Sequence, residues 1–215
     1  MKYRFVAVEG PIGVGKTSLV DLLAARFNAV KVSERIENPF LRDFYRDKPG
    51  AAFQAQLFFL LNRYQQQQKL AQSDLFQQVT VCDYLFARDK IFAYLNLDDS
   101  ELMIYERLYS LLAEKVPQPD LVIYLQASTD VLMERIRGRK RDFEAELSES
   151  YVNDLNQAFN YFFYHYTSTP LLVINTSEID FVHRKEDLDD LVNQIRNMNR
   201  GVQYYSPLGT SKGTR

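Results

Sequence analysis

The sequence predicts an α/β fold in which helices flank a central parallel sheet, and three observations lead to that prediction. Four short apolar runs, at residues 3–8, 78–82, 121–125 and 171–175, have the composition of buried strands. A helix-like stretch follows each run, and the first run also leads directly into a glycine-rich segment. Strands that alternate with helices are typical of a parallel sheet with helices on its faces.

A weaker apolar run at residues 29–33 is a candidate fifth strand, so we expect a five-stranded sheet. Six stretches between the runs have helical character, namely residues 17–27, 51–71, 100–114, 129–137, 148–166 and 185–198. No linker interrupts this alternation. We therefore expect residues 1–200 to form a single domain and residues 201–215 to form a C-terminal tail that is partly disordered.

Composition excludes several classes of protein. The 215 residues are 46% hydrophobic and 25% charged, as in an ordinary globular domain with a full core. A net charge of -2 gives no overall field for gripping a nucleic-acid backbone, so we expect no nucleic-acid partner. No apolar run has membrane-spanning length, and the one cysteine, Cys82, cannot form an internal disulfide. These features favour a cytoplasmic protein.

The glycine-rich segment at residues 10–17, GPIGVGKT, matches the phosphate-binding P-loop pattern G-x-x-x-x-G-K-[ST] between a strand and a helix. The motif predicts a P-loop NTPase fold that binds ATP. Lys16 would reach the β- and γ-phosphates, and the Thr17 hydroxyl would bind Mg²⁺. The residues predicted to bind the nucleotide here are Gly10, Gly13, Val14, Gly15, Lys16, Thr17 and Ser18.

Two further features fit a phosphate site. Asp83 closes the third apolar run, where a second Mg²⁺ ligand is expected, although it could instead be a helix N-cap. The segment at residues 135–141, RIRGRKR, places four arginines at alternate positions and predicts an arginine-rich lid over the phosphates. We expect Arg139 and Arg141 to act on the transferred group, with Arg137 and Arg135 as contributors.

A kinase also needs a group beside the acceptor hydroxyl. Glu34 and Glu37 follow the second strand and are both candidates for the catalytic base. The helix at residues 51–71 places Gln56 and Arg63 near one face with apolar neighbours such as Phe53, which indicates polar groups set into an apolar wall.

At this point the chain resembles the bacterial deoxyadenosine/deoxyguanosine kinase branch of the deoxynucleoside kinase family, over nearly its whole length. The matching stretches are VEGPIGVGKTSL, ENPFLRDFYRD, AFQAQLFFLLNRY, CDYLFARDKIFA, PDLVIYLQAS, RIRGRKRDFE and INTSEIDFV. The resemblance implies transfer of the γ-phosphoryl of ATP to the 5′-hydroxyl of deoxyadenosine or deoxyguanosine, with deoxycytidine as a further acceptor. It also implies a role in nucleotide salvage and a homodimer.

The resemblance also assigns roles to residues. Glu34 becomes the base that activates the 5′-hydroxyl, after a one-residue gap in the match, and Glu37 stays its rival. Tyr45 and Glu144 would bind the sugar 3′-hydroxyl, Gln56 would bind the base edge, and the charged pair Arg63 and Asp89 would bind the nucleobase. Phe53 would form a pocket wall. The adenine of ATP would lie against Asp180, Phe181 and Val182.

One position departs from the family pattern. Many members carry an arginine after the acidic residue that ends the third strand, whereas this chain has Tyr84. Arg88, Lys90 or the lid arginines would then supply the missing charge. Two other functions stay open, a nucleoside monophosphate kinase of the thymidylate-kinase type, whose acceptor pocket could use Arg35, Arg42 and Arg46, and a non-catalytic nucleotide-binding regulator.

Overall fold

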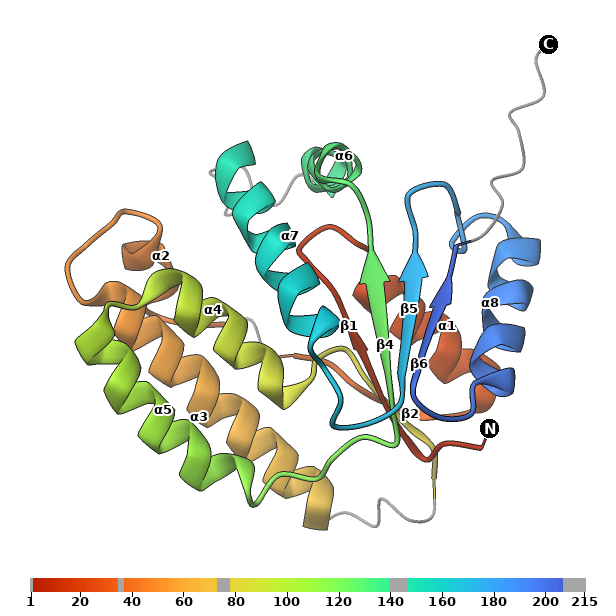
Figure 1. Cartoon of the computed structure of the whole chain (residues 1–215), viewed down its shortest axis with the longest axis horizontal. Helices are drawn as coiled ribbons and strands as arrows, with labels where there is room; N and C mark the ends of the chain where they lie inside the picture. The colour runs from red at the N-terminus through yellow and green to blue at the C-terminus, as the bar shows by residue number, and fades with distance from the viewer. Residues whose placement is uncertain (1, 35–36, 73–77, 140–146, 207–215) are drawn as a thin grey trace.

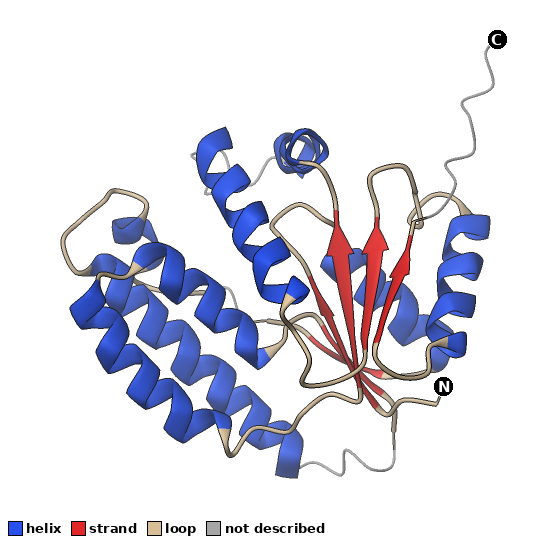
Figure 2. Cartoon of the chain, viewed as in Figure 1, coloured by secondary structure: helices blue, strands red, loops and turns tan. Residues whose placement is uncertain are grey.

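The computed structural model describes residues 2–34, 37–72, 78–139 and 147–206. The predicted α/β fold is confirmed, with helices on both faces of a parallel sheet (Figures 1 and 2). The sheet has six strands in the order β2-β3-β1-β4-β5-β6. Their bounds are Phe5–Glu9 (β1), Val30–Val32 (β2), Thr80–Cys82 (β3), Leu121–Gln126 (β4), Leu171–Asn175 (β5) and Val202–Tyr205 (β6).

The prediction of five strands is wrong by one, because β6 lies inside the segment expected to be a tail. β6 pairs in parallel with β5, with Tyr205 opposite Ile174. It forms the edge of the sheet, and its residues Val202 and Tyr204 are 44% and 69% exposed. An exposed edge strand does not need the continuous apolar run by which the buried strands are recognised.

The helices are α1 (Lys16–Phe27), α2 (Leu41–Phe44), α3 (Ala51–Gln72), α4 (Asp89–Asn96), α5 (Asp99–Ala113), α6 (Thr129–Arg139), α7 (Glu149–Tyr164) and α8 (Lys185–Asn197). A single 3₁₀ turn, η1 (Phe86–Arg88), precedes α4. All six expected helices are present. The short α2, η1 and α4 were not predicted, because none is long enough to establish a helical period in the sequence.

The two faces of the sheet bury different side chains. Residues alternate along β4, where Ile123 faces a core shared with α1 and α8, and Tyr124 faces a core shared with α7. This alternation follows from the two-residue period of a strand. A third apolar cluster joins α3, α4 and α5 beside the sheet, where these helices form a separate group in Figure 1. The site lies between this helical group and the sheet.

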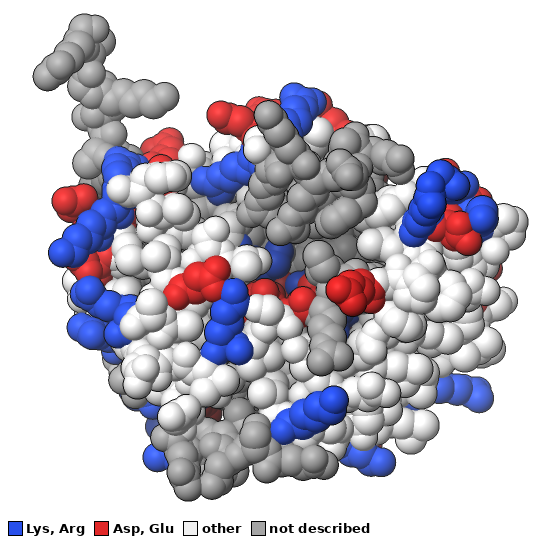
Figure 3. All heavy atoms as spheres, turned by 180° about the vertical axis from the view of Figure 1, so that it is seen from behind, with Lys and Arg blue, Asp and Glu red and all other residues white. Residues whose placement is uncertain are grey.

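The outer surface carries charges of both signs. Figure 3 shows Lys and Arg interspersed with Asp and Glu over the described part of one face, without one extended patch of a single sign. In the described ranges, no helix combines the length and apolar character that crossing a bilayer would require.

The contribution of β6 is testable by truncation. Deleting residues 201–215 removes β6 and exposes the hydrogen-bonding edge of β5. We expect this to lower the free energy of unfolding by about 2–3 kcal/mol and the midpoint of thermal unfolding by roughly 5–10 °C. Deleting residues 207–215 leaves β6 intact and is the matched control. Equal unfolding midpoints for both truncated chains would show that β6 contributes no stability.

Candidate active site

The candidate site is a cavity of about 300 Å³ at the carboxyl ends of β1, β2 and β3. In a parallel sheet, ligands bind at this edge, near the strand where the chain switches direction across the sheet. Here that strand is β1, which lies between β3 and β4. The lining residues that the following paragraphs use are Lys16, Thr17, Glu34, Phe44, Tyr45, Gln56, Phe59, Arg63, Asp83, Arg88 and Phe92.

The P-loop connects β1 to α1 with the geometry that its glycines allow. Gly10 and Gly13 have φ angles of +150° and +87°. A Cβ at Gly10 would lie 2.5 Å from the Leu125 carbonyl oxygen, and one at Gly13 would lie 2.9 Å from that of Leu132. The loop can therefore approach β4 and α6 only with glycine at these positions.

Lys16 begins α1 and lines the cavity. Its Nζ donates to the carbonyl oxygens of Gly10, at 2.7 Å, and Pro11, at 3.0 Å. Burial and repulsion from Arg88 lower the pKa of Lys16 to about 8. An anion beside Lys16 would offset both effects, which is the property expected of a phosphate-binding lysine.

The other residues predicted to bind the nucleotide differ in their exposure. Thr17 is exposed to the cavity, Ser18 is half-buried, and the Val14 side chain belongs to the buried core. Phe181 packs beside the P-loop, since a Cβ on Gly15 would lie 3.1 Å from the Phe181 ring.

The loop around Phe181 is held by its own hydrogen bonds. Asp180 accepts from the backbone N–H groups of Val182 and His183, at 3.2 and 3.0 Å. The Val182 side chain is 49% exposed. This loop therefore borders the P-loop, and its contact with adenine stays a prediction.

The arginines of the predicted lid differ in their contacts and exposure. Arg135 donates to the backbone carbonyls of Val14, at 3.2 Å, and Thr176, at 2.8 Å, so it braces the P-loop against the loop after β5. Arg137 is exposed on α6. The Arg139 side chain lies outside the described residues, as do Arg141 and Glu144, and their predicted roles stay predictions.

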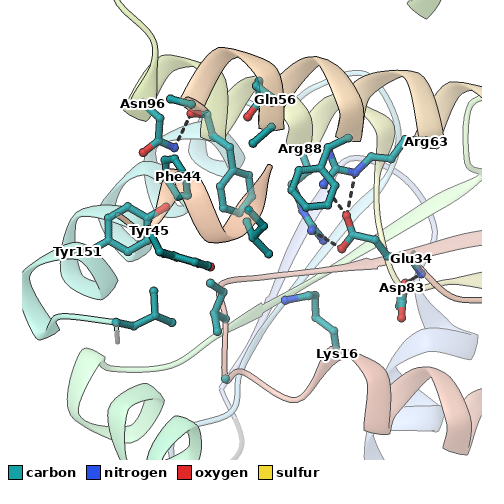
Figure 4. A pocket seen from close by; sticks show the side chains of 18 of the residues that line it. Lys16, Glu34, Phe44, Tyr45, Gln56, Arg63, Asp83, Arg88, Asn96 and Tyr151 are labelled. Carbon is teal, nitrogen blue, oxygen red and sulfur yellow. Dashed lines mark hydrogen bonds and ion pairs between the residues drawn. The ribbon is translucent and has the colours of Figure 1, made fainter. Parts of the chain in front are cut away.

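Glu34 lies at the centre of the cavity between two arginines (Figure 4). Arg63 donates from Nε and Nη2 to Oε1, at 2.9 and 2.5 Å, and Arg88 donates from Nη2 to Oε2, at 2.5 Å. Burial raises the pKa of Glu34, but the charges of Arg88 and Arg63 outweigh it and lower the pKa to about 2. The carboxylate is therefore ionised over the whole working pH range.

Glu37, the rival candidate, is exposed on the surface. Glu34 has a side chain only 11% exposed and lines the cavity with Lys16. The geometry thus favours Glu34 over Glu37 as the candidate base in this cavity.

Arg63 extends the ion pairing to Asp89. The Arg63 guanidinium pairs with the Asp89 carboxylate through Nη1. Asp89 also accepts from the Gln56 amide nitrogen and the Tyr105 hydroxyl, both at 2.8 Å. Asp89 is completely buried, whereas Gln56 and Arg63 line the cavity. Asp89 therefore lies behind the two residues that could meet a ligand and fixes their orientation.

Only one orientation of the Gln56 side-chain amide forms favourable hydrogen bonds. Its nitrogen donates to the side-chain and main-chain oxygens of Asp89, at 2.8 and 2.9 Å. A flipped amide would set an oxygen against a carboxylate, which is repulsive. The nitrogen is thus committed to Asp89, and the carbonyl oxygen of Gln56 is left as the atom for a ligand edge.

At its other end, Arg88 faces Glu9. The distance from Arg88 Nη1 to Glu9 Oε1 is 3.6 Å, and Glu9 is fully buried. Charges of alternating sign thus run through Glu9, Arg88, Glu34, Arg63 and Asp89, and we call this series the buried ion chain. Burial opposes the charge of Arg88, but Glu34 and Glu9 outweigh it and raise the Arg88 pKa.

The apolar walls differ from the prediction. Phe53 packs into the cluster of α3, α4 and α5 instead of lining the cavity, so its assignment as a pocket wall is not supported. Phe59 takes that position, three residues after Gln56 and four before Arg63, which is the same helix face. Phe44 and Phe92 complete the aromatic lining. The spacing of Phe59 was a signal available in the sequence.

Tyr45 lines the cavity as expected, with its ring 5.3 Å from that of Phe44. Asn96 and Tyr151 were not predicted and line the same end. They come from α4 and α7, and no motif marks them in the sequence.

The structure also distinguishes the candidates for the missing positive charge. Tyr84 is fully buried and donates to Gln66 at 3.0 Å, away from the cavity lining. The Lys90 ammonium lies 4.6 Å from the centre of the Tyr109 ring, on another side of α4. Arg88 is the one of the two candidates near Tyr84 that lines the cavity, and its position there depends on the turn η1, which was not predicted.

Thr17 and Asp83 offer hard oxygen ligands on one cavity wall, and their chemistry fits Mg²⁺. Burial raises the pKa of Asp83. In the described ranges no group of three or more His, Cys, Asp or Glu could hold a metal alone. The fit is therefore to an ion that takes most of its ligands from phosphate and water.

Comparisons with known proteins agree with the resemblance found in the sequence. A family model described as deoxynucleoside kinase matches residues 6–200. Deoxyguanosine kinase of Bacillus subtilis (strain 168) is 32% identical over 200 residues, covering 90% of this chain and 97% of the relative. Deoxyadenosine kinase of Dictyostelium discoideum is 35% identical over 180 residues, covering 80% and 72%.

A solved structure of deoxyadenosine kinase from M. mycoides with bound dATP has the same fold. It superposes with a TM-score of 0.75 at 24% identity, covering 89% of this chain and 98% of that chain.

The Tyr105 hydroxyl provides a test of how Asp89 is held. Tyr105→Phe removes one donor from a completely buried carboxylate. We expect the free energy of unfolding to fall by about 1–3 kcal/mol in denaturant titrations. Tyr109→Phe, one turn further along α5, is the control, and we expect a smaller loss. A Tyr105→Phe protein as stable as the unaltered one would mean that Asp89 does not depend on this bond.

Proposed function

The chain belongs to the deoxynucleoside kinase family, and from that premise we propose that it transfers the γ-phosphoryl of ATP to the 5′-hydroxyl of deoxyadenosine or deoxyguanosine. One observation carries the proposal, namely that a single cavity has the P-loop lysine Lys16 at one end, Gln56 and Arg63 among aromatic side chains at the other, and Glu34 between them. Relatives named deoxyguanosine kinase and deoxyadenosine kinase support a purine acceptor in nucleotide salvage.

We propose ATP with Mg²⁺ as the phosphoryl donor. The P-loop amides and Lys16 would hold the phosphates, and Thr17 and Asp83 would hold the metal ion. When bound, Mg²⁺ would offset the negative charge of the phosphate oxygens. Such an ion would add positive charge to a site whose described carboxylates, those of Glu9, Glu34, Asp83 and Asp89, outnumber its described cations, Lys16, Arg63 and Arg88.

Transfer requires a new bond between the 5′-oxygen and the γ-phosphorus. The bond from that phosphorus to the bridging oxygen of ATP breaks, and its electron pair leaves on ADP. Glu34 would accept the hydroxyl proton. A carboxylate whose pKa is about 2 is a weak base, so Glu34 orients the hydroxyl and receives the proton late, as suits a loose transition state.

The far end of the cavity would hold the nucleobase. Phe44, Phe59 and Phe92 provide apolar contact for a planar ring. The carbonyl oxygen of Gln56 would accept a hydrogen bond from the base edge, while Arg63 and Asp89 keep the amide in place. Buried polar groups of this kind reject bases that leave them unpaired, at a cost of about 1–3 kcal/mol each.

A nucleoside is a better acceptor for this cavity than a nucleotide. Arg42 and Arg46, which a monophosphate acceptor could have used, are exposed and contribute nothing to the described cavity lining. Arg35, the third such candidate, lies outside the described residues. Retention of Lys16, Thr17 and Asp83 in one cavity supports an active kinase over a regulator.

We further propose a homodimer in the cytoplasm, formed by one domain per chain. Exposed aromatic side chains on the adjoining helices α4 and α7 support an interface, since Tyr94, Tyr161 and Tyr164 are 56%, 71% and 78% exposed. The buried free thiol of Cys82 fits a reducing compartment.

A phosphotransfer assay tests the proposed function. With ATP and Mg²⁺, the protein is offered each of the four deoxynucleosides and each of their 5′-monophosphates. We expect turnover of deoxyadenosine or deoxyguanosine in preference to thymidine, and none of the monophosphates. Turnover of monophosphates alone would replace the proposal with a nucleotide kinase, and ATP binding without any turnover would favour a regulator.

Glu34→Gln tests the carboxylate beside the hydroxyl. We expect kcat to fall by about 10²–10⁴-fold, because the proton loses its acceptor, while Glu37→Gln stays within about threefold. Calorimetric binding of ATP and thermal unfolding establish that each variant is folded. A large loss in Glu37→Gln and a small one in Glu34→Gln would reverse the assignment.

A further inference from the structure

We propose that Arg88 is a catalytic residue of this site, whose guanidinium contacts the phosphoryl group during transfer, and that Glu9 is its positioning residue. The inference rests on the proposed kinase reaction. It assigns the positive charge at the reaction centre to a residue of η1 and not to the strand end, where Tyr84 lies.

The first observation is a set of unused donors. A guanidinium has five N–H groups. Nη2 of Arg88 donates to Glu34, but Nε and Nη1 donate no hydrogen bond to any described residue. The Arg88 side chain is only 8% exposed. Leaving buried donors unpaired is unfavourable, so their presence on a residue that lines the cavity indicates a ligand with acceptor oxygens.

The second observation is where these donors lie. Arg88 and Lys16 line one cavity, and each also interacts electrostatically with Asp83, the proposed metal ligand. In Figure 4 Lys16 and the pair formed by Glu34 and Arg88 lie on neighbouring parts of the cavity wall. Arg88 is therefore close both to the lysine that would hold the phosphates and to the carboxylate that would hold the acceptor hydroxyl. A phosphoryl group transferred between these two points would lie near the Arg88 guanidinium.

The ligand chemistry follows from the shape of the group. A charged guanidinium donates well to phosphoryl oxygens. Nε and Nη1 of Arg88 point to different sides of the group, so each can donate to a separate acceptor oxygen. Arg63 has no such capacity, because its Nε, Nη1 and Nη2 are all paired with Glu34 or Asp89. Lys90 faces the Tyr109 ring. Of the two arginines in the cavity lining, Arg88 is thus the one whose free donors suit the transferred group.

Glu9 explains how Arg88 can be held without losing its donors. Glu9 accepts from the backbone N–H of Leu85, at 2.6 Å, and of Gly10, at 3.1 Å, so its carboxylate is fixed between the end of β3 and the P-loop. Its distance of 3.6 Å from Arg88 Nη1 is too long for a good hydrogen bond but short for two charges. Glu9 attracts the guanidinium and leaves Nη1 available.

In the reaction, Arg88 moves no proton. As the bond from the 5′-oxygen to phosphorus forms and the bond to the ADP oxygen breaks, charge spreads over the three other oxygens of the phosphoryl group. Hydrogen bonds from Arg88 to these oxygens strengthen in the transition state and so raise kcat more than they lower KM.

Arg88→Met and Lys90→Met are compared on whichever acceptor the unaltered protein turns over. Arg88→Met should lower kcat by about 10²–10³-fold, with smaller changes in the KM for ATP and the KM for the acceptor. Lys90→Met is the matched control, because it also removes a positive charge nearby in the chain, and its kcat should be nearly unaltered. A kcat for Arg88→Met within about threefold of the unaltered protein overturns the proposal. If Arg88→Met does not fold, Arg88→Gln replaces it, and unaltered kcat there has the same meaning.

Product binding separates direct contact from an effect through Glu34. Calorimetry compares the affinity for the deoxynucleoside with that for its 5′-monophosphate. Direct contact predicts that Arg88→Met weakens monophosphate binding by a larger factor than nucleoside binding. Equal weakening of both would show that Arg88 only orients Glu34 and would overturn the catalytic role.

Glu9→Gln tests the positioning role. It should lower kcat with KM little changed, and it should cause no further loss when combined with Arg88→Met, because it acts through Arg88. Additive losses would overturn that role. The proposed function fails separately, when the unaltered protein phosphorylates only monophosphates, in which case Arg88 is tested on those acceptors. An unaltered protein that turns over no acceptor overturns both proposals.

Discussion

The Glu34 carboxylate, ionised and held between Arg63 and Arg88, is the interaction on which the rest of the site depends. These three side chains come from the end of β2, from α3 and from η1, so their contacts join the sheet to the helical group beside it. Each charge is buried and stable only because its partners are present, and removing one partner of such a pair costs about 3–5 kcal/mol. The cavity therefore keeps its shape through the same groups that would perform the chemistry.

The buried ion chain also divides the cavity into two chemical regions. Toward the P-loop, Arg88 with its unpaired donors and Lys16 face the space for phosphates. Toward α3, Arg63 is saturated with carboxylate partners, and Asp89 fixes the amide of Gln56. One end can then stabilise charge that appears during transfer, and the other can recognise a neutral base without rearranging. Preorganisation of this kind is where enzymes gain most of their electrostatic stabilisation.

Features with a local sequence signal were predictable. The P-loop, the buried strands and the common helix face of Gln56 and Arg63 follow from motif and periodicity, and the family resemblance implied that Glu34 shares their pocket. Features that depend on tertiary contacts were not. β6 is an exposed edge that needs β5 to exist, and Arg88 reaches the cavity only through a three-residue turn. Phe53 and Phe59 have the same side chain on the same helix, and only the rotation of α3 relative to the packed elements decides which one lines the cavity.

The most direct test of the account is a crystal structure with a purine deoxynucleoside and a non-hydrolysable ATP analogue with Mg²⁺. The account predicts the 5′-oxygen within hydrogen-bond distance of a Glu34 carboxylate oxygen, the base edge at the carbonyl oxygen of Gln56, and the γ-phosphate beside Lys16. A nucleoside bound with its 5′-oxygen away from Glu34, or with its base outside the wall formed by Phe44, Phe59 and Phe92, would contradict it.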